Sequence, residues 1–144
     1  MIVIFMLTFY CPHCWKRIDG NNEYCPNCGF DLTEFSRLTY EEKLILSLHH
    51  PLPGRRNIAA QVLGNIQSVK ALDEFEKILQ SGETDYFYLR VILQAIAKID
   101  SPRKMYLLQM AETNPNILIR DLATTLIKSV KENNPIPEWD RGTG

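Results

Sequence analysis

The stretch that decides the fold spans residues 55–79 and reads RRNIAAQVLGNIQSVKALDEFEKIL. Apolar residues recur every three or four positions on both sides of a short turn that contains Ser68, which is the pattern of two amphipathic helices. Ser68 is a suitable N-cap for the second helix, because its hydroxyl can accept a hydrogen bond from a free backbone N–H. In the first helix we expect a buried set of Ile58, Ala59, Val62, Leu63 and Ile66. The stretch therefore predicts a helical hairpin.

The same helical pattern of apolar residues continues on both sides of this stretch. Thr39 with Glu42 forms a capping-box pattern at one helix start, and Ser101 with Pro102 is typical of another. The segment TDYFYLRVILQAIAKID is apolar on almost every face, so we expect it to be central and to bury Phe87 and the aliphatic residues that follow. Six helices are predicted, over residues 39–50, 52–66, 68–82, 84–100, 101–114 and 114–134.

Internal similarity accompanies this pattern. Arg56, Arg90 and Arg120 recur at steps of 34 and 30 residues, each beside an Ala-bearing helix. The segment IAAQVLGNI and the Asp85 that precedes Arg90 resemble HEAT-type repeats over residues 40–131. The resemblance implies an α-α superhelix of about three HEAT-like helix pairs, with the arginines bridging neighbouring units. A plain six-helix bundle is the alternative.

The four cysteines lie in a second motif, YCPHCWKRIDGNNEYCPNCGF at residues 10–30. Cys11, Cys14, Cys25 and Cys28 form two Cys-x-x-Cys pairs that suit a tetrahedral site of four thiolates, and we predict one structural Zn²⁺. Iron is an alternative metal ion for the same four cysteines. A thioredoxin-like redox site would need a βαβ setting that the sequence lacks, and a disulfide framework would need an oxidising compartment.

This motif resembles short N-terminal zinc ribbons over residues 9–32. Tyr24 before the second pair and Gly29 after it follow that pattern. Trp15 departs from it, because it stands where the first Gly is usual, so we expect either a modified first turn or packing of Trp15 against the rest of the chain. We place His13 on the solvent side, since four thiolates complete the site, and a hairpin turn at Asp19-Gly20.

Three parts are expected: a zinc ribbon with an apolar N-terminal strand (1–35), a HEAT-like helical repeat domain (36–132) and an extended or disordered tail (133–144). The segment MIVIFMLTFY is too short to cross a membrane and has no signal-peptide features, which favours a cytoplasmic protein without membrane association. Translation starts at Met1 or at Met6. We expect Trp139 to dock on the last helix, with a hook for another protein as the alternative.

Composition limits the function. The net charge is −1 over 144 residues, which argues against a general nucleic-acid binder. The sequence contains no phosphate loop or catalytic triad, and we interpret His49 with His50 as an ordinary helix end and Tyr86, Phe87 and Tyr88 as mostly core. We therefore expect no enzyme but a zinc-binding adaptor with a protein partner, capable of homodimerisation. A nucleic-acid-associated zinc-ribbon factor of transcription or translation is the alternative.

Overall fold

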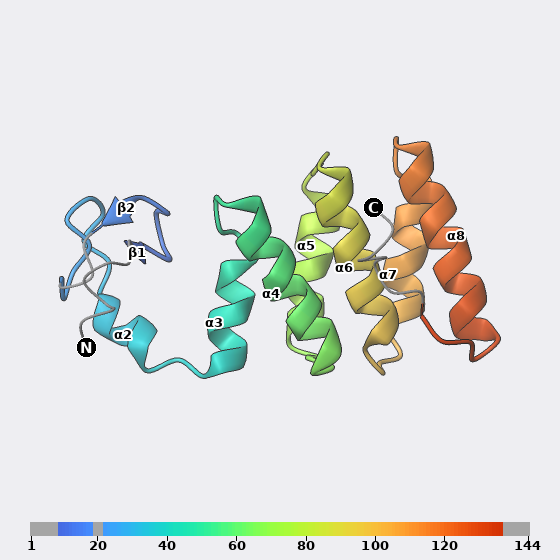
Figure 1. The fold of residues 1–144 in the computed structure, drawn as a ribbon, viewed down its shortest axis with the longest axis horizontal. Helices are drawn as coiled ribbons and strands as arrows, with labels where there is room; N and C mark the ends of the chain where they lie inside the picture. The colour runs from blue at the N-terminus through green and yellow to red at the C-terminus, as the bar shows by residue number, and fades with distance from the viewer. Residues whose placement is uncertain (1–8, 19–21, 137–144) are drawn as a thin grey trace.

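The computed structural model describes residues 9–18 and 22–136. Most of this part of the chain is helical and very little is strand (Figure 1). The two short strands pair antiparallel, with Phe9 opposite Ile18 and Tyr10 opposite Arg17. The elements in chain order are β1 (Phe9–Tyr10), β2 (Arg17–Ile18), α2 (Leu32–Ser36), α3 (Tyr40–Ser47), α4 (Pro53–Asn65), α5 (Ala71–Gln80), α6 (Tyr86–Lys98), α7 (Lys104–Met110), the 3-10 helix η1 (Ala111–Thr113) and α8 (Ile117–Lys131).

The helices form a row. Helix α6 contacts α4 on one side and α8 on the other, and these three run in the same direction, with their first turns at the upper edge in Figure 1. Helices α5 and α7 return the chain between them. Helix α5 contacts α6, and α7 contacts both α6 and α8. The antiparallel return follows from the short connections, which bring consecutive helices back beside each other. Within the described residues, no helix has the length and apolarity needed to cross a membrane.

All six predicted helices are present, but most are shorter than predicted. The capping box of Thr39 and Glu42 is confirmed, with both reciprocal hydrogen bonds formed. Ser68 and Ser101 accept hydrogen bonds from the backbone of Ala71 and Arg103, but these close a turn that precedes the helix. The predicted starts of α5 and α7 are thus too early. The short helix α2, which Asp31 caps through the Thr33 N–H, was not predicted.

The core lies along α6, as its apolar sequence predicted. Residues from Val91 to Ala97 are all buried, because α4 and α8 cover two sides of the helix and α5 and α7 a third. Gly64 of α4 makes the closest approach: a Cβ there would lie 2.7 Å from the Ala95 Cα atom. The neighbouring helix fits there only because position 64 lacks a side chain.

Three residues predicted to be buried are exposed instead. Ile58, Ile66 and Phe87 are 60%, 49% and 56% exposed. Their helices carry more apolar residues around the circumference than the neighbouring helices cover, so the pattern alone overestimates the core. Of the aromatic cluster, only Tyr88 is fully buried, and its hydroxyl donates to the Leu48 carbonyl.

Ion pairs join neighbouring helical hairpins. The Arg56 guanidinium bonds the Asp85 carboxylate at 2.8 Å and lies over the Tyr88 ring, as a bridging role for this arginine predicts. Arg120 acts locally instead and donates to the carbonyls of Asn114 and Pro115. Arg103, which the repeat pattern did not single out, bonds Asp73 and Glu76 of α5.

The predictions for the two ends of the chain fall partly outside the described residues. Of the predicted N-terminal strand, the described residues are Phe9 and Tyr10, and both lie in β1. In the tail, Ile136 packs against the hydrophobic core. Met1, Met6, the Asp19-Gly20 turn and Trp139 lie outside the described residues.

Candidate metal centre

Two similar turns hold the four cysteines. In the first, the Cys11 N–H donates to the Lys16 carbonyl and the Trp15 N–H donates back to the Cys11 carbonyl, at 3.0 and 2.7 Å. In the second, Cys25 makes the same two bonds with Phe30 and Gly29, both at 2.9 Å. Each turn is therefore closed by hydrogen bonds within six residues. Because the turn is this local, the Cys-x-x-Cys pattern predicts it from the sequence alone.

The closed turns aim backbone donors at the sulfur atoms. The His13 N–H points at the Cys11 Sγ at 3.4 Å, and the N–H groups of Asn27 and Cys28 point at the Cys25 Sγ at 3.3 and 3.4 Å. Such bonds stabilise a thiolate more than a thiol, because the anion is the better acceptor. The local backbone is thus arranged for ionised cysteines.

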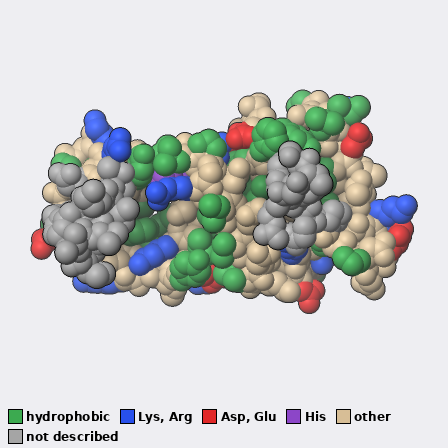
Figure 2. All heavy atoms as spheres, in the orientation of Figure 1, with side chains coloured by type: hydrophobic (Ala, Val, Ile, Leu, Met, Phe, Trp, Pro, Cys, Tyr) green, Lys and Arg blue, Asp and Glu red, His purple; other side chains and the backbone are tan. Residues whose placement is uncertain are grey.

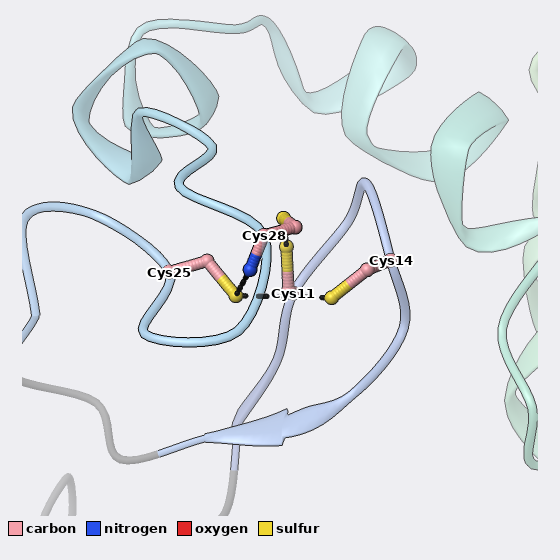
Figure 3. Close-up of side chains that lie close together, drawn as sticks. All are labelled: Cys11, Cys14, Cys25 and Cys28. Carbon is pink, nitrogen blue, oxygen red and sulfur yellow. Dashed lines mark hydrogen bonds between the residues drawn. The ribbon is translucent and has the colours of Figure 1, made fainter.

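The four side chains converge on one point (Figure 3). The Sγ atoms of Cys11 and Cys28 are 3.6 Å apart and those of Cys14 and Cys25 are 3.7 Å apart, and all four lie within 4.8 Å of one another. The cysteines are free thiols. A tetrahedral ion with metal–sulfur bonds of about 2.3 Å requires sulfur separations of about 3.8 Å, so the site is the right size for one ion such as Zn²⁺.

The electrostatics of the site also favour a cation. The side-chain amide of Asn27 donates to the Cys14 Sγ at 3.4 Å and, with a backbone bond from Lys16, lowers the pKa of Cys14 to about 6. For Cys28, a backbone bond from Phe30 lowers the pKa, but burial and the three neighbouring sulfurs outweigh it and raise the pKa to about 12. Four thiolates so close together need a positive charge between them to ionise together.

The residues that follow the two turns adopt the same backbone conformation. Gly29 has φ of +80° and Trp15 has φ of +61°, which is the left-handed region in which L side chains are disfavoured. The sequence raised two possibilities for Trp15. A modified first turn is wrong, because Trp15 adopts the positive φ of Gly29, and packing of the indole ring outside its own turn is confirmed.

The Trp15 ring reaches the helical part of the chain. It lies 5.2 Å from the His50 ring, and Tyr10 meets the same imidazole edge-on at 4.7 Å. His50 is 7% exposed, and its Nδ1 accepts the Leu52 N–H at 3.1 Å. Burial, and then the nearby Arg55 charge, lower the pKa of His50. This imidazole is therefore a contact between the cysteine turns and the loop from α3 to α4.

Sequence reasoning missed this role of His50. Both histidines were interpreted as an ordinary helix end. The unusual Trp15 was a sign that some contact existed, but no local sequence pattern could identify His50 as its partner. His49 instead pairs with Glu74 of α5. His13 is on the exposed side, as predicted, where its ring stacks on Phe30 with centroids 5.5 Å apart. In the described part of the chain, the four cysteines form the one group of three or more His, Cys, Asp or Glu side chains close enough to hold a metal.

Comparisons with known proteins give one relative to report. The chain is 33% identical over 54 residues to an uncharacterized protein of Haemophilus influenzae, and the match covers 37% of this chain and 71% of the relative. No family model matches the chain. No solved structure matches it either. The extent of the match shows that the chain belongs to the same family as this Haemophilus influenzae protein.

Proposed function

We propose that the protein is a non-enzymatic adaptor that binds one structural Zn²⁺ through Cys11, Cys14, Cys25 and Cys28 and binds a protein partner through its helices. The observation that carries this proposal is the sulfur cage: four free thiols at separations of 3.6 and 3.7 Å match a tetrahedral ion and leave no open position for a substrate. A closed site of this kind supports a structural role for the metal.

The helical part supports the adaptor role. Helices α4, α6 and α8 lie side by side with α5 and α7 behind them, which is the arrangement expected of HEAT-like repeats. Stacked helical repeats present an extended surface, and such surfaces serve mainly to bind other macromolecules. A reducing compartment such as the cytoplasm would keep the four thiols available for the metal.

The metal assignment is tested by native mass spectrometry of the full chain, before and after a strong chelator, with elemental analysis of the same sample. We expect one zinc ion per chain, bound without disulfides and removed by the chelator. A metal-free protein with two disulfides would refute the site, and iron in the purified protein would refute its identity as zinc.

The adaptor role is tested separately. The tagged chain is cross-linked in its native host, and cross-linked peptides are identified by mass spectrometry, with a Cys11→Ser/Cys25→Ser variant as the control. We expect one recurrent protein partner with cross-links to α4, α6 or α8. Recovery of nucleic acid with retardation of labelled RNA or DNA at low salt would instead support the nucleic-acid-associated function.

A further inference from the structure

A surface cavity of about 530 Å³ lies at the lower edge of the helical row in Figure 1, opposite the edge at which α4, α6 and α8 begin. It crosses the last turn of α6 and is walled by the ends of α4 and α8, the start of α7 and residues 133–136. The described residues that line it do not include the metal centre. Small-molecule sites usually have volumes of about 300–1,000 Å³, so the cavity is large enough for a small organic ligand.

The polar side chains that line this cavity mainly offer hydrogen-bond donors. Asn65 uses its side-chain oxygen to accept from the Lys98 ammonium at 3.1 Å. Gln67 uses its side-chain oxygen to accept from the Asp100 N–H at 3.4 Å. Each amide therefore keeps its NH₂ group as a donor, because an amide side chain has one oxygen and one NH₂ group. Lys104 adds a second ammonium, whose bond to an α6 carbonyl is long, at 3.5 Å. The cavity thus suits a ligand that is rich in acceptors.

The charge around the cavity is positive. Of the described residues that line it, none is acidic. Four lysines line the cavity or lie within two positions of its lining residues: Lys98, Lys104, Lys128 and Lys131. Figure 2 shows both basic and acidic side chains at the surface near the lower end of α6. The carboxylates in the same stretches are those of Asp100 and Glu132, and Glu132 accepts from the Asn134 amide at 3.1 Å. The lysines outnumber these carboxylates, which favours an anionic ligand.

The turns after α4 and α8 engage carbonyls that would otherwise face such an anion. Gln67 donates its N–H to the Gly64 carbonyl at 3.1 Å, and Asn133 donates to the Val130 carbonyl at 3.3 Å. Both donors have positive φ, of +54° and +55°, in the region that glycine prefers. In the described part of the chain, Trp15 is the one other non-glycine residue with positive φ. Two amide side chains are thus kept at strained positions of one cavity, which indicates that they have a function there.

From these donors and charges we propose that the cavity binds a small organic phosphate ester. A phosphate monoester presents three strong acceptor oxygens and nearly two negative charges, which match the amide NH₂ groups and the ammonium groups. Lysine binds phosphate as a point charge, so Lys104 needs no fixed geometry. The apolar lining formed by Val130, Pro135 and Ile136 would contact the organic part of the ligand. The proposal goes beyond the adaptor function and does not depend on it.

The test is an NMR titration of the full, isotopically labelled chain as purified, followed through the side-chain NH₂ signals of Asn65 and Gln67. The probes are AMP, ribose-5-phosphate, inorganic phosphate, citrate and adenosine. We expect both phosphate esters to shift these signals and to bind at least about tenfold more tightly than the other three probes. A titration in which neither ester shifts the two signals would overturn the proposal. Equally tight binding of inorganic phosphate, citrate or adenosine would also overturn it.

Variants locate the binding. Lys104→Gln should weaken AMP binding about tenfold, because it removes an ammonium from the cavity. Lys77→Gln on α5 is the control: it removes a lysine that is 72% exposed and does not line the cavity, so binding should not change. Gln67→Gly removes an amide but suits the positive φ, so binding should weaken about threefold or more while the thermal midpoint stays level or rises. Equal effects of the two lysine variants, or unchanged binding by Gln67→Gly, would overturn the site.

Discussion

The imidazole of His50 shows how much one residue can decide. Its ring is buried between Tyr10 and Trp15 from the cysteine turns, and its Nδ1 accepts the Leu52 N–H. Protonation would remove that acceptor and place a charge near Arg55. The neutral ring therefore fits the contact and the protonated ring does not.

This gives a pH prediction. The pKa of His50 is lowered in the folded state, so the unfolded chain takes up the proton first, and stability is lost as the pH falls below about 6.5. Urea unfolding at pH 7.5 and 5.5 measures how much the free energy of unfolding falls. We expect a smaller fall for the His50→Asn variant than for the parent protein. His49, which pairs with Glu74, is present in both proteins, so its contribution cancels in the comparison. An equal loss of stability in both proteins would show that groups other than His50 cause the pH dependence.

Trp15 combines a strained backbone with a long-range contact. Positive φ costs a residue with a side chain roughly 1–2 kcal/mol, which glycine avoids. Trp15→Gly should therefore keep or raise the metal affinity measured by chelator competition, but lose the packing on His50.

The loss of packing should be visible by proteolysis. Trypsin should cut faster after Arg37, between α2 and α3, in Trp15→Gly than in the parent, whereas Tyr106→Ala should leave the rate unchanged. If Trp15→Gly loses the metal, the indole stabilises the site itself and our assignment of its role is wrong.

At the scale of the element, the contact between α4 and α6 depends on one missing side chain. Gly64→Ala would place a Cβ 2.8 Å from the Ala95 Cβ and closer still to the backbone, which must shift. Overpacking of this kind costs about 1–3 kcal/mol. Urea unfolding should show that loss.

The same helix provides the control. Gly54 is in the first turn of α4 and has nothing within 4 Å of the position of an added Cβ. Gly54→Ala should be neutral or stabilise by about 0.4–1 kcal/mol, because alanine reduces the freedom of the unfolded chain. Similar effects of the two substitutions would mean that the helices separate easily at Gly64.

At the scale of the whole molecule, the two parts should differ in their dependence on metal. The cysteine turns contain few apolar side chains, so the metal would supply their folding free energy, on the order of 10 kcal/mol for zinc. The helices have a continuous buried core of their own along α6.

Metal removal should therefore unfold only part of the chain. After chelation, the circular dichroism signal at 222 nm should change little and its thermal midpoint should shift by a few degrees at most, while Trp fluorescence changes as Trp15 leaves His50. A Trp139→Phe background isolates the Trp15 signal. Collapse of the helical signal on chelation would show that the core depends on the metal centre.

The sequence alone determined the cysteine cage and the helices. Each Cys-x-x-Cys turn closes within six residues, and helix periodicity repeats within two turns, so both signals are local. The positive φ at Trp15 was seen only in the structure.

Other features depended on the tertiary structure. The exposure of Ile58 and Phe87 depends on which helices cover them. The contacts of Arg56 with Asp85 and of Trp15 with His50 join residues that are far apart in the chain. An apolar or charged residue has the same sequence signature whether a neighbour buries it or leaves it exposed. Only the packing of whole helices decides which of these occurs, because burial depends on the area that distant segments cover.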